Sequence, residues 1–172
     1  RRYRGFDGVV LACIDFADPE VIELVQSSIP VVTIDYLFNN RIAIMSDNVA
    51  GMKELLEYIY SRGHRKIAYI HGAMSAVTSG RLSSFYRTPE RLGLQIPDEY
   101  IREAAYRDTT TTYRVTNELL DLPDPPTCII YPDDFASFGG INAIRERGLQ
   151  IPEDISVAGY DGIQSARQLE PS

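Results

Sequence analysis

Residues 127–161 constrain the fold most, because they have the pattern of a strand, a helix and a second strand. The short apolar run 128–131 lies between Pro126 and Pro132 and is rich in β-formers, so it predicts a buried strand. Gly148 ends the helix that follows, and residues 155–158 form the second strand. Strands joined through a helix are expected to be parallel, with a right-handed crossover.

The helix of this unit is predicted to begin at Asp133 or Asp134. A core-facing stripe is predicted from apolar residues that recur at every third position, namely Phe135, Phe138, Ile141 and Ile144. The helix should therefore lie with this stripe against the sheet.

Carboxylates follow both strands of the unit. Asp133 and Asp134 come after the first strand, and Asp161 comes after the second. Ligands of open parallel sheets bind beyond the carboxyl ends of the strands, so these acids are expected at one binding site. Asp134 is most simply the N-cap of the helix, which leaves Asp133 to reach a ligand or to lie in a solvated turn. Asp161 either contacts a ligand or only ends its strand in a turn.

Upstream of this unit, strands and helices alternate, which indicates an α/β protein with parallel sheets flanked by helices. Strands are predicted at 9–14, 31–34, 42–45, 67–70 and 101–106. The first of them is a continuous apolar run, as expected for a strand covered on both faces. Helices are predicted to begin after Asp18, after Asn48, near Ser79 and after Asp108, and Pro89 is expected to interrupt the third.

Composition excludes several classes of function. A formal net charge of −7 and a pI near 4.8 argue against nucleic-acid binding by this segment itself. No apolar run approaches the roughly 18 residues of a membrane span, so no membrane association is expected. Cys13 and Cys128 both fall in predicted strands, which favours buried free thiols, although a disulfide stays open.

Sequence motifs favour ligand recognition over catalysis. His64 and His71 have no Cys or His ligands near them in sequence, and neither a nucleophile elbow nor a glycine-rich phosphate loop is present, so we expect no metal, no cofactor and no enzyme. Arg81 is either an exposed arginine at a helix start or a ligand contact. A cation in the first turn of a helix opposes the helix dipole, which favours the ligand contact. Tyr106 could cover the apolar face of a sugar, and Ser75 lies in the polar loop after Gly72. Together with Arg81, Asp133 and Asp161, these candidate residues suit a ligand with several hydroxyl groups.

Five segments, in order and spacing, resemble the effector-binding core of the lactose/galactose-repressor (LacI/GalR) family of transcriptional regulators. They are DGVVL at 7–11, IPVVTID at 29–35, SDNVAG at 46–51, GHRKIAYIHG at 63–72 and PEDISVAGYD at 152–161. The resemblance covers essentially all 172 residues. Periplasmic sugar-binding proteins share this fold, so a transport-associated sugar-binding protein is the alternative.

The resemblance implies a two-lobed periplasmic-binding-protein-like fold, incomplete in this segment. Residues 1–64 would be part of the N-terminal lobe and residues 65–172 the C-terminal lobe. It also implies a small-molecule effector, a sugar, in the cleft between the lobes. Such regulators are cytoplasmic homodimers that contact operator DNA through an N-terminal helix-turn-helix domain, which this segment lacks.

Site residues carry over from the family by position. Arg81 matches the effector-contacting arginine, Asp133 the polar residue before the helix-capping Asp134, and Asp161 the effector-binding aspartate. Tyr106 or Arg107 falls near the family's stacking aromatic residue. The sequence departs from the family pattern in two places: Ser84 replaces the usual glycine, and Pro89 follows within the same helix.

Overall fold

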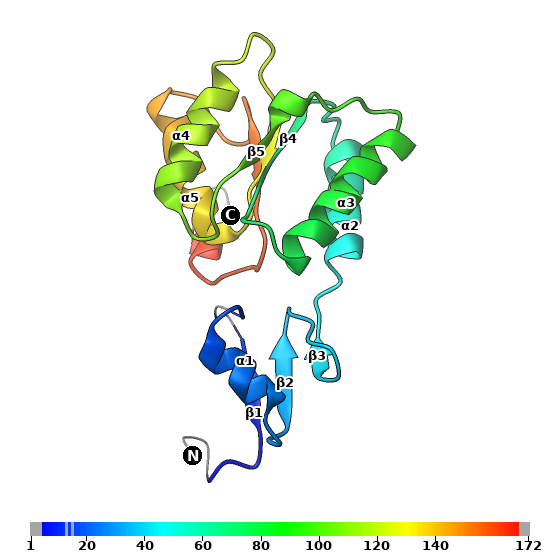
Figure 1. Ribbon diagram of the computed structural model, residues 1–172. Coiled ribbons are helices and arrows are strands. Elements are labelled where there is room, and N and C mark those ends of the chain that lie inside the picture. The colour runs from blue at the N-terminus through cyan, green and yellow to red at the C-terminus, as the bar shows by residue number, and fades with distance from the viewer. Residues whose placement is uncertain (1–4, 13, 15, 169–172) are drawn as a thin grey trace. The chain divides into compact units, whose positions relative to one another are not determined.

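The computed structural model describes residues 5–12, 14 and 16–168 (Figure 1). The chain divides into two compact units, residues 1–48 and 49–172, and each is described by itself. We predicted the boundary later, after residue 64. The helix at residues 48–61 packs on the sheet of the second unit. The boundary between the two units therefore lies at the start of this helix and not after it.

Unit 1 is a three-stranded parallel sheet with one helix. Its elements are β1 Val9–Leu11, α1 Pro19–Gln26, β2 Val31–Ile34 and β3 Ile42–Ile44, in the sheet order β1-β2-β3. Asp18 caps α1 through its side chain, which accepts a hydrogen bond from the Glu20 N–H at 2.7 Å. Leu24 and Val25 of the helix pack against Leu11 and Val31 of the sheet.

The other face of this sheet carries apolar side chains that unit 1 does not cover. Val10, Ile42 and Ile44 are 64%, 70% and 60% exposed. The prediction that the first strand is covered on both faces is therefore wrong within the described part of unit 1, because α1 covers one face only. Cys13, predicted in the same strand, lies outside the described residues.

Unit 2 is a four-stranded parallel sheet with helices on both faces. Its strands are β4 Ile67–His71, β5 Ile101–Glu103, β6 Cys128–Ile130 and β7 Ser156–Ala158, in the order β5-β4-β6-β7. Its helices are α2 Asn48–Ser61, α3 Ala76–Arg91, α4 Thr109–Leu120 and α5 Asp134–Glu146, with short 3₁₀ turns at Asp98–Tyr100 and Ala166–Gln168. The predicted parallel pairing of the strands on either side of α5 is confirmed by β6 and β7.

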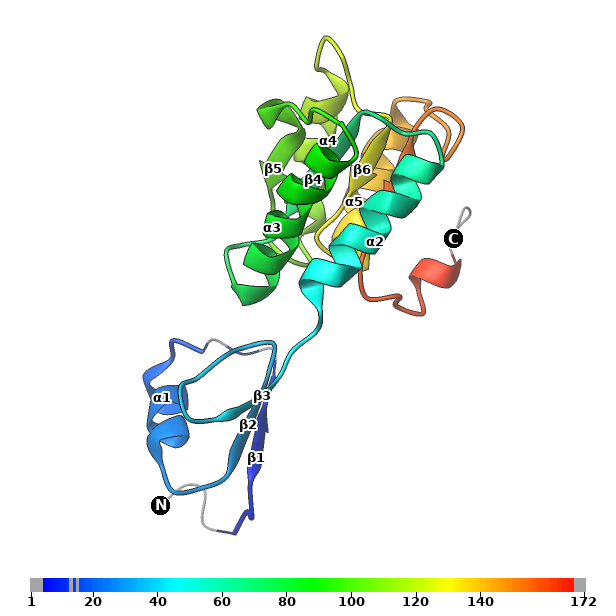
Figure 2. The same cartoon turned by 90° about the vertical axis from the view of Figure 1, so that its right-hand side faces the viewer.

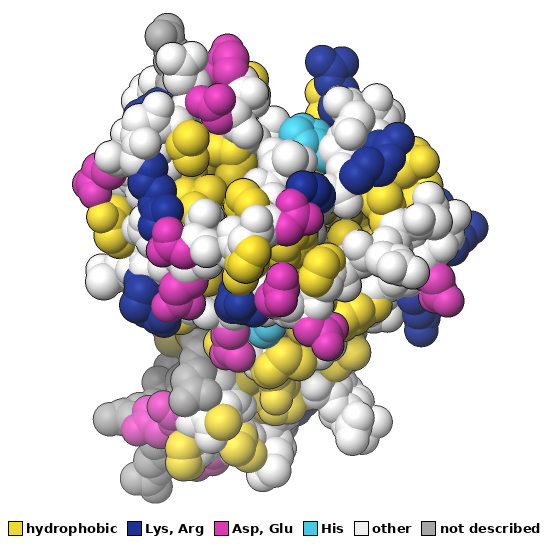
Figure 3. Space-filling model, turned by 90° about the horizontal axis from the view of Figure 1, so that it is seen from above, with side chains coloured by type: hydrophobic (Ala, Val, Ile, Leu, Met, Phe, Trp, Pro, Cys, Tyr) yellow, Lys and Arg dark blue, Asp and Glu magenta, His cyan; other side chains and the backbone are white. Residues whose placement is uncertain are grey.

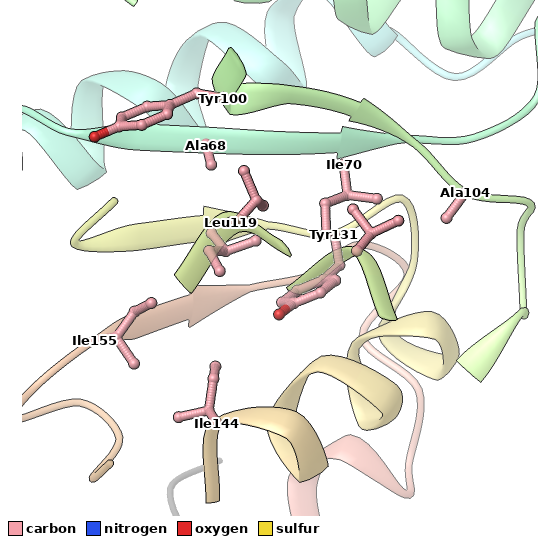
Figure 4. Close-up of a cluster of buried hydrophobic side chains, with 10 residues drawn as sticks. Ala68, Ile70, Tyr100, Ala104, Leu119, Tyr131, Ile144 and Ile155 are labelled. Carbon is pink, nitrogen blue, oxygen red and sulfur yellow. The ribbon is translucent and has the colours of Figure 1, made fainter. Parts of the chain in front are cut away.

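Alternate residues of the central strands point into two separate cores, as the period of a strand requires. Helices α2 and α3 lie on one face of the sheet, and α4 and α5 lie on the other (Figures 1 and 2). Ile67 and Tyr69 of β4 pack toward α2 and α3, whereas Ala68 and Ile70 pack toward α4 and α5. Figure 4 shows the second of these cores, with Tyr131 and Ile144 among its members.

Helix α5 is oriented differently from the prediction. Ile141 and Ile144 are buried, but Phe135 is 41% exposed, so the predicted stripe is wrong at its first position. Small residues fill the rest of the buried face, namely Ala136, Ser137, Gly139, Gly140 and Ala143. Helix α4 packs closely against Gly139, and the Tyr131 ring covers Gly140.

Helix α3 starts earlier and continues further than predicted. Ser75 is its N-cap, and the helix runs through Pro89 to Arg91. Pro89 lies in the last turn, where it removes one intrahelical hydrogen bond, yet the helix continues for two more residues, so the expected interruption does not occur. Ser84, which replaces the family's glycine, donates a hydrogen bond of 2.8 Å to the carbonyl oxygen of Val49 and so ties α3 to the start of α2.

Hydrophobic, acidic and basic side chains are intermingled on the face of the molecule shown in Figure 3. Among the helices that the structure describes, none is long and apolar enough to cross a membrane.

Candidate functional site

All four strands of unit 2 run in the same direction, so their carboxyl ends lie at one edge of the sheet. We call this the carboxyl edge. The segments that follow the strands there are Gly72–Ser75 after β4, Tyr106 and Arg107 after β5, Pro132–Asp134 after β6, and Tyr160 and Asp161 after β7. The candidate residues chosen from the sequence lie on these segments or, in the case of Arg81, on α3 beside them.

Arg81 joins two of the strand ends. Its side chain is only 7% exposed, and its Nη1 donates a hydrogen bond of 2.8 Å to the carbonyl oxygen of Pro132. Its guanidinium carbon lies 3.7 Å from the centroid of the Tyr160 ring, which places the cation over the aromatic face. Of the two roles left open by the sequence, the exposed arginine is therefore excluded. A buried guanidinium at this edge is fixed in one orientation before any ligand arrives.

Two buried phenols surround this arginine. Within the described part of the chain, neither the Tyr69 nor the Tyr160 hydroxyl oxygen has a hydrogen-bond partner. Burial raises the pKa of Tyr160 to about 12, although the positive charge of Arg81 acts in the opposite direction. The pKa of Tyr69 is also raised by burial and is likewise opposed by Arg81. Both phenols are thus neutral at physiological pH.

Tyr106 packs against the end of β4. Its hydroxyl shares a hydrogen bond of 2.8 Å with the Thr78 hydroxyl, and its ring lies on Gly72, where a Cβ would overlap the ring. Ser75 is exposed and caps α3, since its Oγ accepts a hydrogen bond of 3.1 Å from the Thr78 N–H. Thr78 therefore connects the two candidates, Tyr106 and Ser75.

Asp133, not Asp134, is the N-cap of α5, which corrects the sequence assignment. One carboxylate oxygen of Asp133 accepts a hydrogen bond of 2.7 Å from the Ala136 N–H, and the other accepts one of 2.8 Å from the Arg107 N–H. The side chain is only 4% exposed. Two adjacent acids both suit a helix N-terminus, and the contact with Arg107 on a distant loop is not visible in the sequence.

Asp134 instead holds the loop that follows β7. Its N–H donates to the carbonyl oxygen of Tyr160 at 2.9 Å, and its Oδ2 accepts from the Ile163 N–H at 2.9 Å. Gly159 lies so close that a Cβ there would overlap Oδ1 of Asp134. The glycine before Tyr160 is the one sequence signal for this contact.

Asp161 lies on the loop held by Asp134. It is exposed, and its φ of 95° is in the region that residues with a Cβ rarely adopt. Strained residues of this kind concentrate at binding sites. The position at the end of β7 is the one expected from the sequence, and the ligand contact itself stays a prediction.

The structure brings the candidate residues to one edge of one unit, and it adds residues that sequence reasoning missed. Arg81 and Asp133 adjoin the same short segment, and Tyr106 precedes the residue whose N–H binds Asp133. The missed features are Thr78, the contact of the Arg107 N–H with Asp133, Asp134 in its actual role, and Tyr160. Two of them had a signal: Tyr160 belongs to the strand-end motif of residues 159–161, and Gly159 of the same motif marks the close approach of Asp134.

No group of three or more potential metal ligands occurs among residues 5–12, 14 and 16–168. A hollow of about 540 Å³ lies beside β7, lined by residues such as Leu55, Ile59 and Val157. None of the carboxyl-edge residues described above lines it, and its polar lining comes from residues such as Arg62, His64 and Ser156.

Comparisons with known proteins place this geometry in a family. The model of the periplasmic binding protein-like domain matches residues 56–172. The HTH-type transcriptional repressor PurR of Escherichia coli O139:H28 (strain E24377A / ETEC) is 28% identical over 171 residues, which cover 96% of this chain and 50% of that protein. The chain thus spans about half the length of the curated relatives it matches.

Solved structures give the same result. A regulatory protein of LacI family from Chloroflexus aggregans is 30% identical, with a TM-score of 0.86 over 99% of this chain and 62% of that chain. A LacI transcriptional regulator from a Rhodococcus species is 26% identical, with a TM-score of 0.85 over 96% of this chain and 61% of that one. The chain therefore belongs to the periplasmic binding protein-like domain family and has the core fold of LacI-family regulators.

Proposed function

We propose that this chain is the effector-sensing core of a LacI/GalR-type transcriptional regulator and that it binds a sugar at the carboxyl edge of unit 2. One observation carries the proposal: the parallel sheet collects the ends of four strands at a single edge, and Arg81, Asp133 and Asp161 all lie there. Open α/β sheets bind their ligands at this position. The relatives, which are transcriptional regulators, favour a sensor over a transport protein or an enzyme.

The side chains at this edge suit a polyhydroxylated ligand. Asp161 is exposed and can accept hydrogen bonds from adjacent hydroxyl groups, while Arg81 donates to hydroxyl or ring oxygens. Tyr106 offers a ring for the apolar face of a sugar, and Ser75 can donate or accept. Each carboxylate oxygen of Asp133 accepts one backbone N–H and has a second lone pair, which could accept a hydrogen bond from a ligand hydroxyl.

Regulation would follow from differential binding. A sugar that binds one conformation more tightly shifts the population toward it, and operator affinity changes reciprocally. The acidic charge of −7 means that operator DNA would be contacted by another part of the protein. We further propose a homodimer that works in the cytoplasm without a cofactor.

Calorimetry on the full-length protein with a panel of neutral pentoses and hexoses tests the site. Replacement of a charged hydrogen-bonding group costs about 1.5–3 kcal/mol, so Asp161→Ala should weaken binding by roughly 10-fold to 100-fold. Asp98→Ala is the matched control, because Asp98 is also an exposed carboxylate but precedes β5 at the opposite edge. Unchanged affinity in Asp161→Ala would remove the site assignment.

The regulatory part of the proposal has its own test. Binding of the full-length protein to DNA from upstream of its own gene should change when the sugar identified by calorimetry is added. A protein that binds the sugar but shows no affinity for DNA would support the transport alternative instead.

A further inference from the structure

We propose that Arg107 is a specificity-determining residue that selects an effector carrying an anionic group, a phosphate or a carboxylate. The inference rests on the proposed function, since it assumes that the carboxyl edge binds the effector. It goes further by assigning the charge of the ligand, and it concerns a residue whose role the sequence did not separate from that of Tyr106.

The backbone of Arg107 is held in an unfavourable conformation. Its φ is 61°, in the left-handed region that glycine and asparagine adopt readily and that an arginine adopts at a cost. The Arg107 N–H donates a hydrogen bond of 2.8 Å to Asp133, whose carboxylate is buried and caps α5 at the same time. The surrounding structure therefore fixes this arginine where a glycine would be less strained. A strained non-glycine residue at a strand end is evidence that its side chain is used.

The side chain of Arg107 is exposed to solvent at the carboxyl edge of unit 2. Its guanidinium carbon lies 5.5 Å from the centroid of the Phe135 ring. Phe135 is itself 41% exposed in the first turn of α5, which is the reason that it fails as a core residue. An aromatic ring beneath a guanidinium restricts its orientation and leaves its N–H groups to solvent or ligand.

Two arginines thus flank one short segment. Arg81 donates to the carbonyl oxygen of Pro132, and the backbone of Arg107 is fixed by the next residue, Asp133. The acids between them are engaged by the backbone: Asp133 accepts from two N–H groups, and Asp134 accepts from that of Ile163. Acceptors for a neutral sugar are therefore partly occupied, whereas a guanidinium can bind a carboxylate or phosphate through two parallel hydrogen bonds.

The test uses matched ligand series on the full-length protein. Calorimetry compares D-glucose, D-gluconate and D-glucose 6-phosphate, and in parallel D-ribose, D-ribonate and D-ribose 5-phosphate. In at least one series, the carboxylate or the phosphate should bind at least 10-fold more tightly than the neutral sugar. The anionic member that binds more tightly identifies which of the two groups is recognised.

Variants then assign the preference to Arg107. Arg107→Gly, which relieves the backbone strain, and Arg107→Gln should each lower the affinity for the anionic ligand until it no longer exceeds that for the neutral sugar. Asp133→Asn should reduce the preference, because an asparagine oxygen can cap the helix but its amide group then faces the Arg107 N–H as a donor. Arg87→Gln removes an exposed arginine of α3 and is the control that should leave the preference unchanged.

The outcomes separate this inference from the proposed function. Equal affinity for neutral and anionic ligands, or a preference that survives both Arg107 variants, overturns the inference and leaves sugar sensing intact. Failure of every neutral and anionic ligand to bind overturns both.

Discussion

At the scale of single residues, Asp133 connects stability to the candidate site. Its two oxygens satisfy N–H groups on two different elements, the first turn of α5 and the loop after β5. The sequence predicted that one of two adjacent acids caps the helix, and it chose the wrong one. Local preference is nearly equal at the two positions, so the tertiary contact to Arg107 decides between them.

Asp133→Ala should destabilise the protein by about 2–4 kcal/mol, because a cap is lost and a buried N–H group is left without its acceptor. Asp133→Asn should cost about 1–2 kcal/mol less than the alanine variant, since asparagine caps helices as well as aspartate does. Urea denaturation followed by circular dichroism gives both values. Equal destabilisation by the two substitutions would show that the helix cap contributes little.

The buried thiol of Cys128 should be unreactive in the native protein. Its side chain is 1% exposed, it forms no disulfide, and burial raises the pKa of the thiol to about 12. A thiol whose pKa is raised on folding stabilises the protein below its unfolded pKa near 9, and this contribution is lost as the pH rises toward 12. In a Cys13→Ser background, Ellman's reagent at pH 8 should react with Cys128 only after denaturation. Rapid labelling of the native protein would show that this side of the core opens.

At the scale of elements, close packing against α5 depends on two glycines, Gly139 toward α4 and Gly140 toward Tyr131 of the sheet side. A Cβ on Gly139 would overlap the carbonyl oxygen of Thr109, and one on Gly140 would overlap the hydroxyl of Tyr131. Because the small residues face α4, the helix is turned so that Phe135 lies outside the core and beneath Arg107. The packing of two helices thus sets the orientation of a residue at the carboxyl edge.

Gly139→Ala should destabilise unit 2 by about 1–3 kcal/mol or more, the usual cost of overpacking, despite the better helix propensity of alanine. The obstacle is a backbone atom of α4, which a side-chain rotation cannot remove. Asn142→Ala is the control, because Asn142 is exposed on the same helix and should change stability little. Chemical denaturation of the two variants provides the comparison, and a Gly139→Ala protein as stable as the control would contradict the close approach.

Element type was predictable from local pattern, whereas element orientation was not. Caps such as Asp18 and Asp108 and the stop at Gly148 follow from chemistry within a few residues, and the structure confirms them. Phe135 failed because the periodicity of a helix shows which residues share a face but not which of two possible faces meets α4. The strand ends of the site were located from the same local rules, but Thr78 and Arg107 enter through contacts between distant segments.

At the scale of the whole molecule, α2 determines where one unit ends and the next begins. Met52, Leu56 and Ile59 of this helix are 0%, 1% and 4% exposed in the core that they share with β4, α3 and β6. The sequence placed the boundary after residue 64, in the turn between α2 and β4. An amphipathic helix between two sheets can pack on either, and its apolar face alone does not identify the partner.

Truncation should distinguish the two boundaries. Removing a buried Met, Leu or Ile side chain costs about 2–5 kcal/mol, so loss of all three is comparable with a total stability of about 5–15 kcal/mol. A fragment of residues 46–172 should therefore unfold cooperatively in thermal denaturation, whereas a fragment of residues 65–172 should lack a native core and bind hydrophobic dyes. Within the longer fragment, Met52→Ala should cost about 2–5 kcal/mol, and Val49→Ala less than about 1 kcal/mol because Val49 is 48% exposed. If the shorter fragment folds as stably as the longer one, α2 belongs to unit 1 instead.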